Sequence, residues 1–195
     1  MAASDRGLAL AEVVVAAGLS LVLAAVAVPV VGGTLDREHV IVGTQHLAAQ
    51  FQRARLESLK RGAAVAVKFA QLDGRTAIQL FVDGNGNGVL QRDIDRRLDP
   101  ALTPVEWLDG HARGVALRIN QPIVDVGTGS VMATGDDPLR IGNSSLVSFS
   151  PLGGSTSGTL YLAAQRGPQM AIRIYGATGR VRVVMFDARA RQWRP

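Results

Sequence analysis

The sequence predicts an α+β fold in which one long N-terminal helix precedes an antiparallel β-sheet. Residues 8–31 form an apolar run, residues 36–61 repeat apolar side chains with a helical period, and short β-rich runs follow residue 62. A helix followed by strands is the order of an α+β domain. With 195 residues, 47% of them hydrophobic, the chain can bury one core. It has no cysteine, which excludes disulfides and thiolate metal sites.

The apolar run has the composition of a membrane-spanning helix. Residues 8–31 carry Glu12 as their only charge and rise roughly 36 Å as a helix, which exceeds a hydrocarbon core of about 30 Å. Two alternatives are a secretory signal, cleaved after the small-x-small sequence at residues 25–27, and a buried helix of a soluble protein. We expect a membrane span.

Glu12 needs a positive partner, because an acid at the centre of a membrane helix costs about 2.5–3.5 kcal/mol. If the chain is cut between Gly7 and Leu8, the new α-amine lies one helical turn before Glu12. That amine, on the same chain or on a neighbour, is the natural counter-ion.

The helix is expected to continue through residues 36–62 and to lie on the sheet. One face carries Val40, Thr44, Leu47, Phe51, Ala54 and Ser58. Gly62 follows two cations and is expected to stop the helix. Pro29 removes one backbone hydrogen bond and predicts a kink, unless it marks a helix end before Gly32 and Gly33.

The remainder of the chain predicts strands separated by turns. The expected strands cover residues 65–69, 77–82, 115–119, 146–149, 159–162, 170–175 and 180–186. Residues 120–145 predict a long loop with weak strand character.

The start of the chain resembles the class III signal of type IV pilins and type II secretion pseudopilins. The resemblance rests on Gly7, Leu8, Glu12 and Pro29 within the apolar helix, although the family usually has Phe and Thr after the cut. It implies that a prepilin peptidase cuts after Gly7 and methylates the amine of Leu8. It also implies that Glu12 registers subunits in a filament and that Pro29 bends the helix.

Later segments resemble the GspH/FimT branch of that superfamily. They are Arg53-Ala54-Arg55-Leu56-Glu57 with Arg61-Gly62, Phe81-Val82-Asp83 with Asn85 and Asn87, residues 147–153, and Gly179-Arg180-Val181-Arg182. The implied organisation is a leader at 1–7, a membrane and filament-core helix at 8–35, its amphipathic second half at 36–62, and a periplasmic β-rich domain at 63–195.

The segment from Asp83 to Asp95 offers a possible calcium loop. Asp83, Asn85 and Asn87 match the first ligands of a twelve-residue loop, but the twelfth position is Ile94 rather than a bidentate acid. Asn-Gly pairs also form tight turns without a metal, and we favour that interpretation.

Nothing else in the sequence indicates catalysis or a cofactor. His39, His46 and His111 are interpreted as too scattered along the chain for a metal site, and no spacing suggests a nucleophile elbow. We expect that the protein is not an enzyme and that it binds no cofactor other than the possible calcium ion.

Positive charge gathers in the last 30 residues. From Arg166 onward there are seven arginines and one acid, whereas residues 1–165 sum to −1 within the total of +5. Such a region predicts an anionic partner, namely nucleic acid, a lipid surface or an acidic protein face, or else a hydrated surface.

Part of this positive charge lies on the closing hairpin, which the strands predicted at residues 170–175 and 180–186 form. If residues 176–179 form the turn, Tyr175 lies opposite Arg180 and Arg173 opposite Arg182, all on the outer face. The core face then carries Ile172, Ile174, Val181 and Val183.

Opposed arginines repel each other, so this arrangement needs an explanation: the arginines bind DNA phosphates, contact acidic filament neighbours or stay hydrated. Some FimT-type minor pilins bind DNA through Gly-Arg-x-Arg, which Gly179, Arg180 and Arg182 match.

The resemblance implies a minor pilin or pseudopilin with roles in filament assembly and secretion, at or near the tip of a type IV pilus or a type II secretion pseudopilus. The expected partners are other pilins, prepilin peptidase and the bacterial inner membrane, crossed once, with the C-terminal domain in the periplasm. A DNA-binding minor pilin is the alternative, and a secreted or lipid-surface β-domain is a third hypothesis. The sequence leaves pilus and secretion system undecided.

Overall fold

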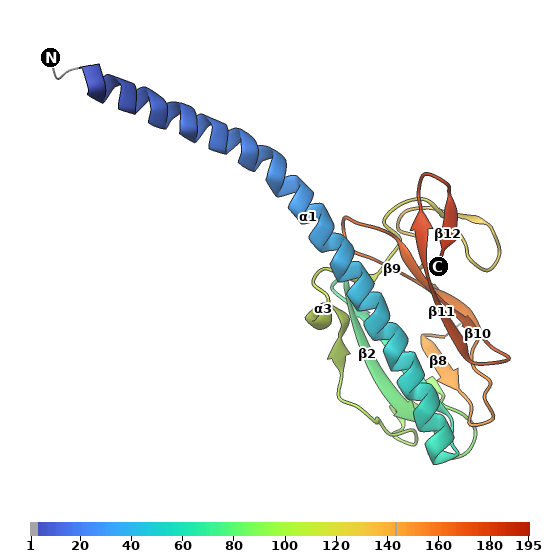
Figure 1. The fold of residues 1–195 in the computed structure, drawn as a ribbon. Coiled ribbons are helices and arrows are strands. Elements are labelled where there is room, and N and C mark those ends of the chain that lie inside the picture. The colour runs from blue at the N-terminus through green and yellow to red at the C-terminus, as the bar shows by residue number, and fades with distance from the viewer. Residues whose placement is uncertain (1–3, 143) are drawn as a thin grey trace.

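A single helix, α1 (Ser4–Arg61), leads into a β-rich body (Figure 1). The computed structural model describes residues 4–142 and 144–195, and within α1 it describes the side chains of residues 10–25 and 34–61. α1 is 58 residues long, and Figure 1 shows its N-terminal half extending away from the body. The helix ends where Gly62 adopts a φ of +63°, so the predicted glycine stop is confirmed.

The body contains two main antiparallel sheets rather than one. The first has the order β3-β2-β1-β8, and the second has the order β12-β11-β10-β9-β4, with β7 also paired to β9. The strands of the first are β1 (Val65–Leu72), β2 (Arg75–Val82), β3 (Glu106–Trp107) and β8 (Leu146–Phe149). Those of the second are β4 (Ala116–Leu117), β7 (Leu139–Arg140), β9 (Gly158–Ala163), β10 (Met170–Tyr175), β11 (Arg180–Asp187) and β12 (Gln192–Arg194). The predicted α+β class is confirmed.

α1 packs against both sheets through the face that its periodicity predicts. Val40, Thr44, Leu47, Phe51, Ala54 and Ser58 are all fully buried. The Phe51 ring lies 6.0 Å from that of Phe69 on β1 and 6.2 Å from that of Phe149 on β8, measured between centroids. The same apolar cluster includes Ile172 and Ile174 of β10. One helix face therefore joins the two sheets.

A second, smaller core lies on the other face of the second sheet. Tyr161, Phe186 and Trp193 pack together there with Ile123 and Met132. The last two belong to the pair β5 (Ile123–Val124) and β6 (Val131–Met132), inside the segment predicted as a loop. Burial of Ile123 and Met132 explains why this part of the segment forms a strand pair.

Several short elements depart from the predictions. The strand predicted at 115–119 is reduced to β4, and neither α2 (Gln91–Asp95) nor α3 (Leu108–His111) was predicted. Elements of two to five residues are too short to show a period, and tertiary contacts alone define them.

The expected membrane location is contradicted. No helix in the described part of the chain is both long enough and apolar enough to cross a membrane, which requires about 20 consecutive, mostly apolar residues. The expectation of a single inner-membrane span with a periplasmic C-terminal domain is therefore corrected.

We expect Phe51→Ala to lower the free energy of unfolding by about 3–5 kcal/mol, because it removes the ring that contacts both β1 and β8 and leaves a cavity. Urea denaturation followed by circular dichroism measures this loss. Leu56→Ala on the exposed side of α1 is the control, with an expected change within about 0.5 kcal/mol. Equal losses in the two variants would contradict the role given to this helix face.

Candidate binding groove at the C-terminal hairpin

The closing hairpin has the predicted register. Tyr175 pairs with Arg180 and Arg173 pairs with Arg182 between β10 and β11. The predicted core face is confirmed, since Ile172 and Ile174 are fully buried and Val181 and Val183 pack against the same cluster. The outer face therefore carries three arginines and one tyrosine.

Gly179 shapes the turn of this hairpin. Its amide donates a 2.8 Å hydrogen bond to the carbonyl of Tyr175, and its φ is +60°. A Cβ at this position would lie 2.9 Å from the carbonyl oxygen of Gly153. Glycine is needed both for the backbone angle and for the close approach of the 150–154 loop.

An open groove of about 540 Å³ lies beside the turn. It is lined by Arg55, Tyr175, Ala177, Thr178 and Arg180. Arg55 comes from α1, and its Nε is buried without a hydrogen-bond partner among the described residues. Arg55 was not predicted to belong to this site, although its place beside the buried Ala54 puts it at the edge of the packed face.

The arginines of the outer face are not equivalent. Arg180 and Arg182 are exposed, and neither forms a salt bridge within the described ranges. Arg173 is half-buried, and its Nη1 donates a 2.8 Å hydrogen bond to Oγ1 of Thr159. Arg173 therefore bonds to β9 within its own sheet. Arg180, Arg182 and the groove residue Arg55 remain available to bind an anion.

An apolar tip stands next to the cationic groove. Leu152 has 95% of its surface exposed, and it precedes Gly153, whose carbonyl approaches Gly179. A cationic groove with an adjacent apolar side chain can bind an anionic surface that also offers an apolar contact.

The Asp83 segment forms a turn held by its own carboxylates. The side chain of Asp83 accepts hydrogen bonds from the backbone N–H groups of Asn85, Gly86 and Gly88. The side-chain amides of Asn85 and Asn87 donate hydrogen bonds of 3.4 and 3.0 Å to the carboxylate of Asp93. The hydrogen bond from Asn87, followed by that from Asn85, lowers the pKa of Asp93. Calcium binding at Asp83, Asn85 and Asn87 stays the untested alternative to the favoured metal-free turn.

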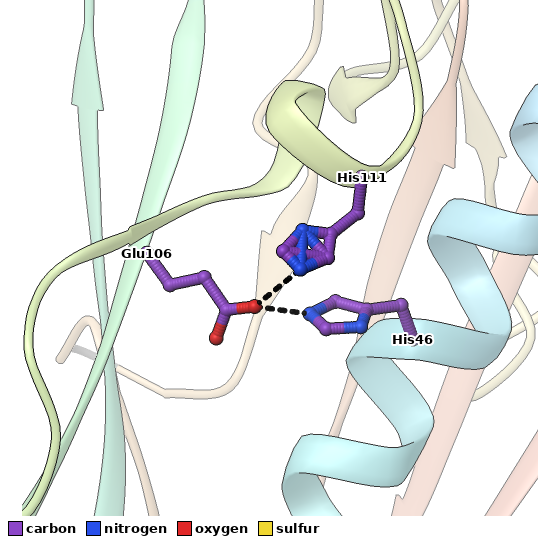
Figure 2. Close-up of side chains that lie close together, drawn as sticks. All are labelled: His46, Glu106 and His111. Carbon is purple, nitrogen blue, oxygen red and sulfur yellow. Dashed lines mark ion pairs between the residues drawn. The ribbon is translucent and has the colours of Figure 1, made fainter.

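A cluster of polar side chains lies where α1, β3 and α3 meet, and Figure 2 shows His46, Glu106 and His111 converging there. The Nε2 atoms of His46 and His111 lie 2.9 and 2.8 Å from the same Oε1 of Glu106. Burial, then the nearby His111, lowers the pKa of His46, although Glu106 opposes the shift.

The interpretation of the histidines as too scattered for a metal site is wrong for His46 and His111. Together with Glu106 they offer ligand atoms that all lie within 4.8 Å of one another. Glu106 belongs to β3, which pairs with β2 through Ile78 and thereby lies next to α1. Gly43 of α1 lets Ala112 approach the helix, since a Cβ on residue 43 would lie 2.9 Å from the Cβ of Ala112. Sequence separation hid both contacts.

The predicted processing residues belong to α1. The side chains of Leu8 and Pro29 and the burial of Gly7 lie outside what the structure describes, so the cleavage site and the kink stay predictions. Glu12 is exposed on the part of α1 that extends beyond the body.

Comparison with known families gives a match. The family model described as "Type II transport protein GspH" matches residues 43–179, well over half of the chain. Neither the curated proteins nor the solved structures gave a significant match.

Proposed function

Because the chain belongs to the GspH family, we infer that it is a minor pseudopilin, built into the filament of a type II secretion system at or near its tip. Its role is structural, in filament assembly and secretion, and it needs no catalytic group. The observation that carries the proposal is the surface of residues 10–25 of α1, which is largely apolar and is exposed in the described chain.

Large apolar side chains surround the helix over residues 10–25. Val13, Val14 and Val15 are consecutive, so they point in directions about 100° apart, and all three are more than 60% exposed. Leu21, Val22 and Leu23 repeat the pattern two turns later. A helix that is apolar on all sides requires burial on all sides, and each such side chain contributes about 1.5–3 kcal/mol when buried. Helices of neighbouring subunits in a filament provide that burial.

The groove supplies a second contact with neighbouring subunits. Arg55 and Arg180 line it and offer positive charge, Arg182 on the same hairpin adds to this charge, and Leu152 offers an apolar contact beside it. An acidic face of another pilin-like subunit matches this combination, because its carboxylates pair with arginine and its apolar atoms cover Leu152.

We expect the mature chain to begin at Leu8 with a methylated amine, as the resemblance of residues 7–12 to the class III signal implies. Mass spectrometry of the chain purified from sheared filaments tests this. A mature start at Val28, after the small-x-small sequence, would contradict it.

We expect Glu12→Gln to reduce incorporation into filaments, because the carboxylate then no longer pairs with a subunit α-amine in apolar surroundings. The measurement is the fraction of chain that co-sediments with sheared filaments. Glu38→Gln changes an exposed glutamate on the same helix and is the matched control, with incorporation expected to stay unchanged. Equal incorporation of both variants would contradict a role of Glu12 in the registration of subunits.

DNA binding by the same hairpin is the second candidate function. It is favoured by two unpaired arginines, Arg180 and Arg182, on a face that also exposes the ring of Tyr175 for base stacking. Gly179 contributes through the turn, and Arg173 contributes through the sheet rather than by touching the ligand.

If DNA is the ligand, Arg180→Ala combined with Arg182→Ala should weaken binding and make it less sensitive to salt. The slope of log K against log salt concentration should flatten by about 0.9 for each phosphate that is no longer neutralised. Fluorescence anisotropy of labelled duplex DNA over a salt series measures both effects. Arg113→Ala combined with Arg166→Ala removes equal charge at exposed sites off the hairpin and is the control. Equal effects of the two double variants would contradict DNA binding by the hairpin. The contact with a neighbouring subunit would then be the function proposed for this face.

A further inference from the structure

The donor set of the histidine cluster is that of a transition-metal site. Two imidazoles and one carboxylate are ligands that bind Zn²⁺ with bonds of about 2.0–2.2 Å. Tetrahedral geometry with such bonds places neighbouring ligand atoms about 3.3 Å apart. The distances of 2.9 and 2.8 Å from the Nε2 atoms of His46 and His111 to Oε1 of Glu106 are within about half an ångström of that value.

The charge of the cluster also suits a cation. Glu106 forms no ion pair with a described lysine or arginine, and its only charged or titratable contacts are the two histidines. An imidazole binds a metal through the lone pair of its unprotonated ring nitrogen. The anionic oxygen therefore faces two rings that can offer lone pairs.

Gln50 lies beside both Glu106 and His46, since its Nε2 is also 3.5 Å from Nε2 of His46. It lies one turn after His46 on α1, is 8% exposed, and its Nε2 donates a 3.0 Å hydrogen bond to Oε2 of Glu106. That bond leaves Oε1 of Glu106 facing the histidines, as outer-shell partners of metal-binding carboxylates do. The Oε1 atom of Gln50 is buried and has no hydrogen-bond partner among the described residues. A water bound to an ion would be a suitable donor for it.

We propose that His46, Glu106 and His111 bind one divalent transition-metal ion, of which Zn²⁺ is the best match, with solvent completing the coordination. The side chain of His111 is 42% exposed, so solvent reaches the cluster. The three ligands come from α1, β3 and α3, and the ion therefore fastens the helix to the edge of the first sheet.

The test uses the full-length chain stripped of metal with a chelator and then titrated by calorimetry. We expect Zn²⁺ to bind with a stoichiometry of one and to raise Tm, and Mg²⁺ to do neither, because Mg²⁺ prefers oxygen ligands. Co²⁺ should give the visible absorption of a tetrahedral site. Absence of Zn²⁺ binding to the wild-type chain would overturn the proposal.

Variants locate the site. His111→Ala and Glu106→Gln should abolish the single Zn²⁺ equivalent, and Gln50→Ala should weaken it by about 10- to 100-fold. His39→Ala and Gln52→Ala, on the same helix but outside the cluster, are the matched controls and should bind normally. Circular dichroism confirms that each variant is folded, and because His111 is partly exposed its removal is well tolerated. Normal binding by both His111→Ala and Glu106→Gln, or loss in His39→Ala, would contradict the assignment.

Discussion

Burial of one face of α1 is the interaction on which the other features depend. Phe51 and its neighbours fill the space between helix and strands, and the same cluster includes residues from both sheets. Because this face fixes the rotation of the helix, it also fixes where the remaining side chains point. His46 and Gln50 then lie on one flank, next to β3 and α3, and Arg55 lies on the opposite flank, beside the closing hairpin.

The predictable parts of the fold are those with a local period. The spacing of Val40, Thr44, Leu47 and Phe51 was sufficient to identify the buried face, and alternation along residues 170–186 gave the hairpin register pair by pair. Gly62 ended the helix as its position after two cations predicted. In each case neighbouring residues in the sequence carry the information, so no tertiary contact was needed.

The features that the sequence did not reveal depend on distant residues meeting. Glu106 reaches His46 only because β3 pairs with β2, and Arg55 becomes part of a groove only because the hairpin turns beside it. The division of the strands into two sheets likewise depends on which distant strands pair, which strand patterns do not encode. The membrane expectation went wrong for a different reason, since it rested on composition alone and the described helix does not meet the requirement for a span.

The length of α1 gives the molecule a mechanical property. As a continuous helix of 58 residues it is a rod about 87 Å long, yet its packing on the sheets begins only near Val40. A pull along the rod axis therefore loads the buried stripe in shear, and all its side chains resist together. A sideways force on the free end would instead peel these side chains from the sheets one turn at a time. Such a subunit should transmit axial tension far better than bending.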